Sequence, residues 1–342
     1  MAVIDEPLEQ VLECYPLKTL EIRNESYKDK KGVWWVKTDS GMKILKKISN
    51  SEETLKFILD AVRHLSENGV HLPGICKTSD GCEYARINDT CYTLTEAVEG
   101  RNPSYSSPRE LDAVAAELGR FHQASRGFAP RPETKPKYHL GLWVEDYSAQ
   151  LEDVNNFYKK ELSLPQNNAF GKMVIKEFPS VYERAQRAVS GLGGKEYGDW
   201  VDRVREAGGL CHQDFAAGNL ILAPSGVLYV IDTDSITIDI PARDIRKLLN
   251  KVMKKAGSWD ADLVKRILRA YQSANPLTAQ EWEVVKLDLM FPHLFLGAAN
   301  KYYYRRDREW SEEKYLKRIS ETAAFEKTLE PVLDGFDRIR PA

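Results

Sequence analysis

The sequence contains few of the features that would place a chain of 342 residues in a specialised class of protein. Its five cysteines, at positions 14, 76, 82, 91 and 211, form no CxxC pair and are odd in number. The sequence therefore predicts neither a zinc site nor a disulfide framework, and a reducing cytoplasm is the expected compartment. Acidic and basic residues nearly balance, 51 against 49, and a formal net charge of −2 gives no general attraction to nucleic acid or anionic membranes. We expect no nucleic-acid partner.

A long apolar run is also missing. The first ten residues, MAVIDEPLEQ, contain no basic stretch that leads into an apolar segment. The most apolar later stretch, LMFPHLFLGAAN at residues 289–300, is short and is interrupted by Pro292 and His293. We therefore expect neither a signal peptide nor a membrane span. What remains is an ordinary soluble composition, 42% hydrophobic and 29% charged, in a chain long enough for two domains or lobes.

The first hundred residues predict a small β-rich lobe with one helix. Residues 32–49, GVWWVKTDSGMKILKKIS, are typical of two strands joined by a turn of sequence DSG. Residues 49–69 have apolar side chains at helical spacing behind a serine cap. Residues 91–100, CYTLTEAVEG, predict a third buried strand. The polar, Pro- and Ser-rich residues 101–110 then mark the boundary between the lobes.

Lys46 lies in an apolar row of the second of these strands. By the period of two it shares one face with Ile44 and Ile48. One interpretation is an edge-strand lysine whose stem packs while its ammonium reaches water. The other is a lysine that faces an anion. On the following helix Glu52 lies near the apolar face and is the better partner for Lys46, although first-turn glutamates also complement the helix dipole.

Helical periodicity dominates the rest of the chain, residues 100–342. Segments with this pattern include ELDAVAAELGRFHQAS, PARDIRKLLNKVMKKAG, DADLVKRILRAYQSA, AQEWEVVKLDLMF and SEEKYLKRISETAAFEKTLEPVLDGF. The second lobe is therefore expected to be larger than the first and mainly α-helical.

Polar residues flank a predicted hairpin in LCHQDFAAGNLILAPSGVLYVIDTDS, residues 210–235. Residues 220–222 and 227–231 are strand-like and are joined by an Ala-Pro-Ser-Gly turn. Asn219 immediately precedes the first strand, and Asp232 immediately follows the second. Antiparallel pairing would therefore bring both side chains to the same open end of the hairpin.

The residue types at this end suit a metal-dependent reaction on phosphate. A carboxylate together with an amide oxygen is a ligand set for a hard cation such as Mg²⁺, which also binds substrate phosphates. Asp214, on the loop that leads into the hairpin, could accept a proton from a nucleophilic hydroxyl or orient it. The alternative is that Asp214, Asn219 and Asp232 cap turns, as single Asp and Asn residues most often do.

The segment HQDFAAGN followed by VIDTDS resembles the catalytic and metal loops of the aminoglycoside phosphotransferase and choline kinase group, relatives of the protein kinases. The resemblance implies an α+β, bilobal protein kinase-like fold with an N-lobe at residues 1–99 and a C-lobe at residues 100–342. Carried over by position, Asp214 would be the catalytic aspartate, and Asn219 and Asp232 would be the metal ligands. ATP and Mg²⁺ are the implied cofactors.

The same resemblance assigns the nucleotide site of the N-lobe. Lys46 would be the phosphate-binding lysine, and Glu52 its partner on the helix, although Glu52 follows Lys46 more closely than in related kinases. The segment TEAVEG is similar to the hinge between the lobes, whose backbone around Thr95 to Ala97 would meet adenine. Where protein kinases have a glycine-rich loop, RNESYKDKKG has a single glycine, and its three lysines, at positions 28, 30 and 31, are candidate electrostatic substitutes.

Four further residues receive supporting roles. By the resemblance, His212 braces the catalytic loop rather than acting as a base. His122 is interpreted as a core histidine with its hydrogen bonds satisfied, and Asp244 as a residue that helps to hold the catalytic region. Asp234 could be a second metal ligand or a loop carboxylate, and the second interpretation is favoured.

Within this superfamily, the chain is most similar to the CotS-type spore-coat proteins of spore-forming bacteria. The resemblance is carried by FPHLFLGAANKYYYRRDREW, ELGRFHQAS and KTDSGMKILKKI. It implies a link to spore-coat formation, a location in the mother-cell cytoplasm and/or the spore coat, and other spore-coat proteins as partners.

Three hypotheses of function follow. The first is a phosphotransferase that uses Mg²⁺ and ATP to phosphorylate a hydroxyl of a small molecule, a sugar or a coat component. The second is a non-catalytic scaffold of the spore coat that keeps the kinase fold, which the missing glycine-rich loop favours. The third is a metal-dependent hydrolase, which leaves Lys46 without a role.

Overall fold

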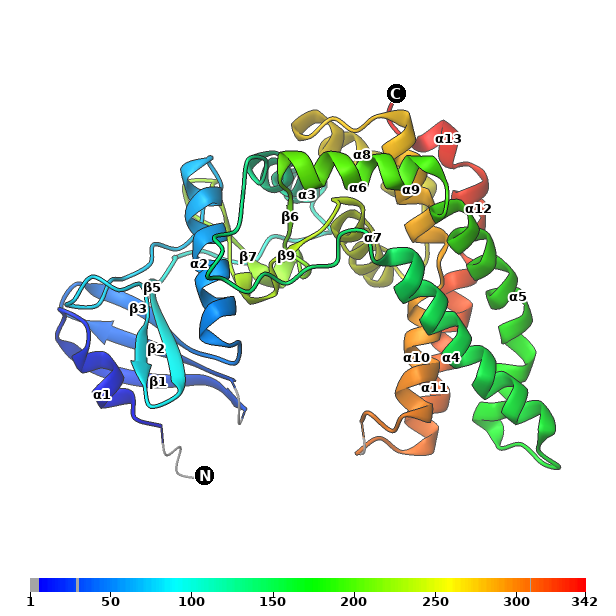
Figure 1. The fold of residues 1–342 in the computed structure, drawn as a ribbon, viewed down its shortest axis with the longest axis horizontal. Coiled ribbons are helices and arrows are strands. Elements are labelled where there is room, and N and C mark those ends of the chain that lie inside the picture. Colours follow the sequence, from blue (N-terminus) through cyan, green and yellow to red (C-terminus); the bar gives the residue numbers. More distant parts are fainter. Residues whose placement is uncertain (1–5, 29–30, 308) are drawn as a thin grey trace. The chain divides into compact units, whose positions relative to one another are not determined.

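The computed structural model describes residues 6–28, 31–307 and 309–342 (Figure 1). These residues form two compact units. Unit 1 is drawn from Met1–Ser104, Phe128–Lys137 and Ala217–Ile236, and unit 2 from Tyr105–Gly127, Tyr138–Ala216 and Thr237–Ala342. The predicted hairpin of residues 220–231 thus belongs to the same unit as the N-terminal segment. The division into lobes at residue 100 stays a prediction. Two sets of residues used in predictions lie outside the described residues: the first five, which entered the prediction on a signal peptide, and Lys30, one of the three candidate electrostatic substitutes.

An antiparallel sheet of five strands forms the body of unit 1. Its order is β1–β2–β3–β5–β4, and the strands are β1 (Thr19–Lys28), β2 (Lys31–Thr38), β3 (Gly41–Ile48), β4 (Ala85–Ile87) and β5 (Thr90–Glu96). The predicted first hairpin is confirmed as β2 and β3. Gly41 follows its turn with a φ of +107°, a backbone conformation that L side chains rarely adopt. The predicted third strand is confirmed as β5.

The two faces of the sheet bury different apolar clusters. Leu45 lies in the cluster that also contains residues of α1 (Leu8–Glu13). Ile48 lies in the other cluster, against α2 (Glu52–Glu67), which confirms the predicted helix. Because side chains alternate along a strand, Lys46 leaves β3 on the same side as Ile48.

The second predicted hairpin is confirmed as β7 (Leu220–Leu222) and β8 (Leu228–Val230), which pair antiparallel. Just beyond the paired residues, the N–H of Ile231 donates to the carbonyl of Asn219 at 3.0 Å. The backbones of Asn219 and Asp232 consequently lie at the same end of the hairpin, as predicted.

Unit 2 is mainly helical, as predicted. Its helices are α3 (Pro108–Ala124), α4 (Trp143–Ser163), α5 (Ala169–Leu192), α6 (Lys195–Ala207), α7 (Ala242–Ala256), α8 (Ala261–Ala274), α9 (Ala279–Met290), α10 (His293–Tyr303), α11 (Glu312–Lys327), α12 (Glu330–Asp334) and α13 (Phe336–Ile339). Helices α3 and α8, α4 and α5, and α10 and α11 pack against each other in pairs (Figure 1). A short antiparallel pair, β6 (Leu210–Cys211) and β9 (Thr237–Ile238), precedes α7. No helix among the described residues combines the length and the apolar character that crossing a membrane requires.

Candidate active site

A cavity of about 590 Å³ lies within unit 1. Its lining comes from the sheet, from α2 and from the β7–β8 hairpin with the residues that follow it. Many of the lining side chains are apolar, among them Ile44, Ile48, Leu55, Ile58, Leu59 and Val62. The charged ones include Lys31, Lys46, Asp232 and Asp234. A largely apolar cavity with a few convergent polar groups is the usual form of a small-molecule site.

Lys46 enters this cavity, so the predicted face of β3 is confirmed. Its Nζ lies 2.5 Å from Oδ1 of Asp232 and 2.9 Å from Oδ2 of Asp234. Burial lowers the pKa of the Lys46 ammonium, but the charges of Asp234 and Asp232 outweigh that effect and leave the pKa raised. The interpretation of Lys46 as a lysine that faces an anion is therefore the correct one, and the ammonium is charged.

Lys47, the next residue of β3, projects from the opposite face. Its Nζ lies 2.5 Å from Oε1 of Glu6, and the other oxygen of Glu6 accepts the hydroxyl of Tyr92 at 2.6 Å. Burial raises the pKa of Glu6, but the hydrogen bonds from Lys47 and the tyrosines outweigh it and leave the pKa lowered. The two adjacent lysines thus serve different sites.

The predicted pairing of Lys46 with Glu52 is wrong. Oε2 of Glu52 lies 2.8 Å from Nη1 of Arg86, and Oε1 accepts the hydroxyl of Tyr84 at 2.6 Å. Glu52 stands in the first turn of α2, directed toward β4, so its carboxylate is satisfied there. Lys46 takes both of its anionic partners from the segment after β8 instead.

At the end of β5, the residues that line the cavity differ in part from the predicted stretch Thr95 to Ala97. Thr95 lines the cavity, but the N–H of Ala97 donates to the carbonyl of Met42 at 3.1 Å, and Ala97 is not part of the lining. Val98 is part of the lining, and in the described part of the chain its N–H has no hydrogen-bond partner. In an antiparallel ladder, hydrogen-bonded and non-bonded pairs alternate. Glu96, next to the bonded residue Ala97, therefore directs its carbonyl away from β3.

The hairpin end carries the two predicted metal ligands. Asp232 has a left-handed backbone, φ 59°, and its side chain is 46% exposed at the cavity. Asn219 ends a short 3₁₀ turn and is half-buried at the same end of the hairpin. A carboxylate and an amide oxygen placed in this way fit a hard divalent cation better than a soft one.

Asp214, the predicted catalytic aspartate, lies in unit 2 on the loop after β6. Its carboxylate forms an ion pair with Lys251 of α7, and half of its side-chain surface is exposed. The N–H of Asp214 donates to Nδ1 of His212 at 3.2 Å. His212 is fully buried against Phe121, so it braces the loop as expected.

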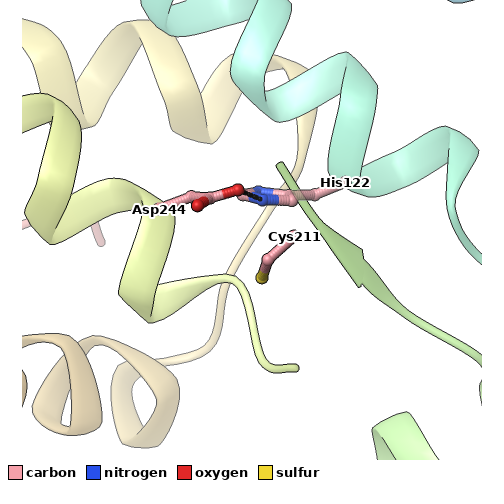
Figure 2. A group of neighbouring side chains, drawn as sticks. All are labelled: His122, Cys211 and Asp244. Carbon is pink, nitrogen blue, oxygen red and sulfur yellow. Dashed lines mark hydrogen bonds and ion pairs between the residues drawn. The ribbon is translucent and has the colours of Figure 1, made fainter. Parts of the chain in front are cut away.

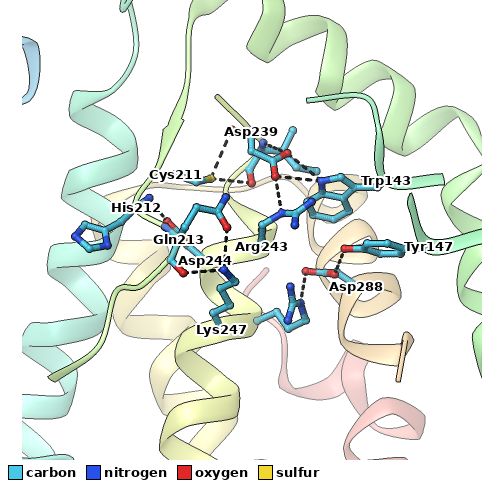
Figure 3. A network of polar contacts seen from close by, with 12 residues as sticks. Trp143, Tyr147, Cys211, His212, Gln213, Asp239, Arg243, Asp244, Lys247 and Asp288 are labelled. Carbon is cyan, nitrogen blue, oxygen red and sulfur yellow. Dashed lines mark hydrogen bonds and ion pairs between the residues drawn. The ribbon is translucent and has the colours of Figure 1, made fainter. Parts of the chain in front are cut away.

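Asp244, near the start of α7, holds the same loop (Figure 3). Its buried carboxylate accepts the N–H of His212 at 2.6 Å and the N–H of Gln213 at 2.8 Å. Gln213 has a φ of +70°, and its carbonyl accepts Nζ of Lys247 at 2.7 Å. Burial raises the pKa of Asp244, but hydrogen bonding to a buried histidine and nearby positive charge outweigh it and leave the pKa lowered. The charged carboxylate therefore fixes the turn before Asp214.

Figure 2 shows His122, Cys211 and Asp244 gathered in the interior of unit 2, and these are residue types that can ligate a metal. Each of them already has protein partners. Nδ1 of His122 lies 2.8 Å from the hydroxyl of Tyr271, Nε2 lies 3.3 Å from Asp244, and the thiol of Cys211 donates to the carbonyl of Ile240 at 3.1 Å. Burial raises the pKa of Cys211 well above its ordinary value, so the thiol stays protonated. We assign no metal to this hydrogen-bonded core cluster.

Buried ion pairs on α7 join it to its neighbours and were not predicted (Figure 3). Nε of Arg243 donates to Asp239 at 2.6 Å. One turn further along, Nε of Arg246 donates to Asp288 at 2.9 Å, and Nε2 of His293 lies 2.9 Å from the other oxygen of Asp288. The available signal was the pair of arginines three positions apart on one helix face, in the helix that follows the β7–β8 hairpin.

A unit with a five-stranded antiparallel sheet and one long helix, together with a second unit that is mainly helical, defines a protein kinase-like fold. An aminoglycoside phosphotransferase from Alicyclobacillus acidocaldarius superposes with a TM-score of 0.83 at 19% identity, covering 99% of this chain and 97% of that one. Amicoumacin kinase hAmiN superposes with a TM-score of 0.63 at 17% identity, covering 94% and 92%. These likenesses confirm the predicted α+β kinase-like fold.

Within this fold, the chain belongs to a family of spore-coat proteins. The family described as "Spore coat putative kinase YutH" matches residues 18–336. Spore coat protein S of Bacillus subtilis (strain 168) is 32% identical over 330 residues, which cover 96% of this chain and 93% of that protein. The predicted resemblance to spore-coat proteins is thereby confirmed.

Proposed function

We propose that this protein is a phosphotransferase that uses Mg²⁺ and ATP to phosphorylate a hydroxyl of a small molecule, a sugar or a spore-coat component. The observation that carries the proposal is the contact between Lys46 and Asp232 at the apolar cavity. An ammonium for phosphate and a carboxylate for the cation meet there at the edge of an apolar wall. A nucleotide needs both of these environments, one for its base and one for its phosphates.

The adenine ring would lie against the apolar lining and bond to the backbone after β5. Its amino group would donate to the carbonyl of Glu96, and a ring nitrogen would accept the N–H of Val98. The carbonyl of Glu96 lies within the predicted stretch from Thr95 to Ala97. The donor moves to Val98, because the N–H of Ala97 is already bonded to Met42.

The triphosphate would lie toward Lys46, with Asp232 and Asn219 as the protein ligands of Mg²⁺. When bound, Mg²⁺ neutralises phosphate charge and fixes the orientation of the phosphate chain. Lys46 adds a fixed positive charge, because its pKa is raised and its ammonium does not titrate near neutral pH.

Asp214 would orient the acceptor hydroxyl and take its proton. The acceptor oxygen bonds to the γ-phosphorus, the bond from that phosphorus to the bridging oxygen breaks, and ADP leaves with the electron pair. The ion pair with Lys251 and the hydrogen bonds of the preceding loop to Asp244 keep the Asp214 carboxylate in position.

The relatives support the nucleotide and the spore-coat parts of the proposal. The amicoumacin kinase structure is a complex with AMP-PNP, Ca²⁺ and Ami, so this fold can hold a nucleotide together with a divalent cation. The relative with 32% identity is named spore coat protein S, which supports an association of this chain with the spore coat. We infer that this chain acts in the mother-cell cytoplasm and/or the spore coat, with other coat proteins as partners.

A non-catalytic scaffold of the spore coat is the second candidate, and the glycine content of residues 23–32 favours it. Gly32 is the single glycine of residues 23–32, and a Cβ at this position would lie 2.2 Å from the ring of Trp34. The packing of Trp34 therefore accounts for Gly32, and the sequence of residues 23–32 contains no other glycine for close approach to phosphate.

Phosphate transfer from labelled ATP separates the two candidates. The parent protein is incubated with Mg²⁺ and with pools of sugars, amino alcohols, hydroxy amino acids and spore-coat extract. Labelled product that is absent with Asp214→Asn supports the phosphotransferase. Binding of Mg²⁺ and ATP without transfer to any pool, and without ATP consumption above the Asp214→Asn background, supports the scaffold.

A further inference from the structure

Helix α2 presents no carboxylate to the cavity that holds Lys46. The α2 residues that line the cavity are all apolar: Leu55, Ile58, Leu59 and Val62. The two carboxylates of the helix that are not fully exposed bind elsewhere, Glu52 to Arg86 at 2.8 Å and Asp60 to Arg131 at 2.7 Å. Lys46 therefore takes no carboxylate partner from α2.

Asp234 is the more buried of the two carboxylates that contact Lys46. Its side chain is 14% exposed, against 46% for Asp232. Nζ of Lys31 lies 4.0 Å from the same oxygen of Asp234 that contacts Lys46. The backbone is held as well, because the carbonyl of Asp234 accepts Nζ of Lys137 at 2.6 Å.

We propose that Asp234 is the residue that positions Lys46 for phosphate, in the place that a helix glutamate holds in protein kinases; this role rests on the function proposed above. Asp232 is exposed and is proposed to hold the cation, so with the cation bound Lys46 would keep one of its two partners, Asp234. Asp234, which is less exposed than Asp232 and is held through its carbonyl, would retain the ammonium at the phosphate end of the cavity. One short turn, residues 232–235, thus carries both the metal ligand and the partner of the lysine.

Two other roles for Asp234 predict different behaviour. A second ligand of Mg²⁺ would matter only when the cation is present, whether or not Lys46 is there. A carboxylate that merely competes with phosphate for Lys46 would, when removed, strengthen ATP binding. The positioning role predicts weaker ATP binding without metal, and only while Lys46 is present.

The test is calorimetric titration of ATP, in EDTA and in Mg²⁺, into the parent, Asp234→Asn, Lys46→Met and the double variant. In EDTA we expect Asp234→Asn to weaken ATP binding about tenfold, the scale of one charge-assisted hydrogen bond. In the Lys46→Met background the same change removes a negative charge beside the phosphates, so affinity should stay the same or rise. If the parent binds ATP only with Mg²⁺, the four proteins are compared in Mg²⁺. The criterion stays the same: Asp234→Asn must weaken ATP binding only when Lys46 is present.

Glu52→Gln is the matched control on the helix and should bind ATP like the parent, because its carboxylate faces Arg86. Asp234→Glu keeps the charge and should restore most of the affinity. Asp234→Ser replaces the asparagine variant if that variant does not fold. A parent that binds no ATP refutes the proposed function and this inference with it. A parent that binds ATP while Asp234→Asn binds equally well, or weakens equally in both backgrounds, refutes this inference alone.

Discussion

Nζ of Lys46 lies 2.5 Å from Oδ1 of Asp232, although 186 positions separate the two residues in the chain. The contact joins β3 to the end of the β7–β8 hairpin within one compact unit. Because Lys47 leaves the same strand on the other face, the site can be tested with neighbouring lysines as variant and control.

Lys46→Met should weaken ATP binding by about tenfold or more, because a charge-assisted contact to phosphate is lost. The melting temperature without nucleotide should change little, since partly exposed ion pairs contribute little to folding stability. Calorimetric titration and thermal unfolding measure the two effects separately.

Lys47→Met should give the opposite result. Lys47 contacts Glu6, whose side chain is 6% exposed, so the substitution leaves a buried carboxylate without this cation. The expected cost is about 1–3 kcal/mol of unfolding free energy, with ATP affinity unchanged. If Lys47→Met abolishes ATP binding and Lys46→Met does not, the two faces of β3 have been assigned the wrong way round.

Asp214→Asn should separate binding from chemistry. The interaction of Asp214 with the acceptor hydroxyl is gained mainly in the transition state, so the variant should bind Mg²⁺ and ATP like the parent. Turnover should fall by roughly a hundredfold or more, the usual scale for loss of a general base. Phosphate transfer to an accepted substrate, or ATP consumption, measures turnover. Turnover equal to that of the parent would remove Asp214 from the mechanism.

His293 predicts a pH dependence of stability in unit 2. Burial holds its pKa down to about 4, against an ordinary value of 6.5. As the pH falls from 6.5 toward 4, the unfolded chain takes up a proton on this imidazole while the folded protein keeps it neutral. The contribution of His293 to the free energy of unfolding is therefore complete above pH 6.5 and is lost over that range. His293→Gln should flatten that part of the profile, measured by urea denaturation across the same range. A difference between parent and variant that does not change with pH contradicts this assignment.

Elements with local signals could be predicted from the sequence. The β2–β3 hairpin has alternating side chains around a DSG turn, and α2 begins behind Ser51, whose hydroxyl accepts the N–H of Thr54. β1 and β4 were not predicted. β1 is an edge strand with a polar sequence, TLEIRNESYK, and its structure depends on pairing with β2 rather than on an apolar pattern. β4 has only three residues.

The sequence locates the residues proposed for the candidate site, but it does not give all of their contacts. Asp214, Asn219 and Asp232 stand at fixed spacings around one hairpin, so a local pattern locates them. The partner of Lys46 is not local. A helical wheel places Glu52 near the apolar face of α2, but the carboxylate is taken by Arg86 from β4, a strand that the sequence pattern did not reveal.

The central claim is that the end of the β7–β8 hairpin holds the cation against the phosphates of ATP. Its most direct test is thermal unfolding of the parent and Asp232→Asn, each with ATP in EDTA and with ATP and Mg²⁺. Asp89→Asn, which alters a 99% exposed aspartate of the same unit, is the control. We predict that Mg²⁺ increases the stabilisation by ATP in the parent and the control, and that Asp232→Asn loses most of this increase. An increase in Asp232→Asn as large as in the parent would contradict the claim.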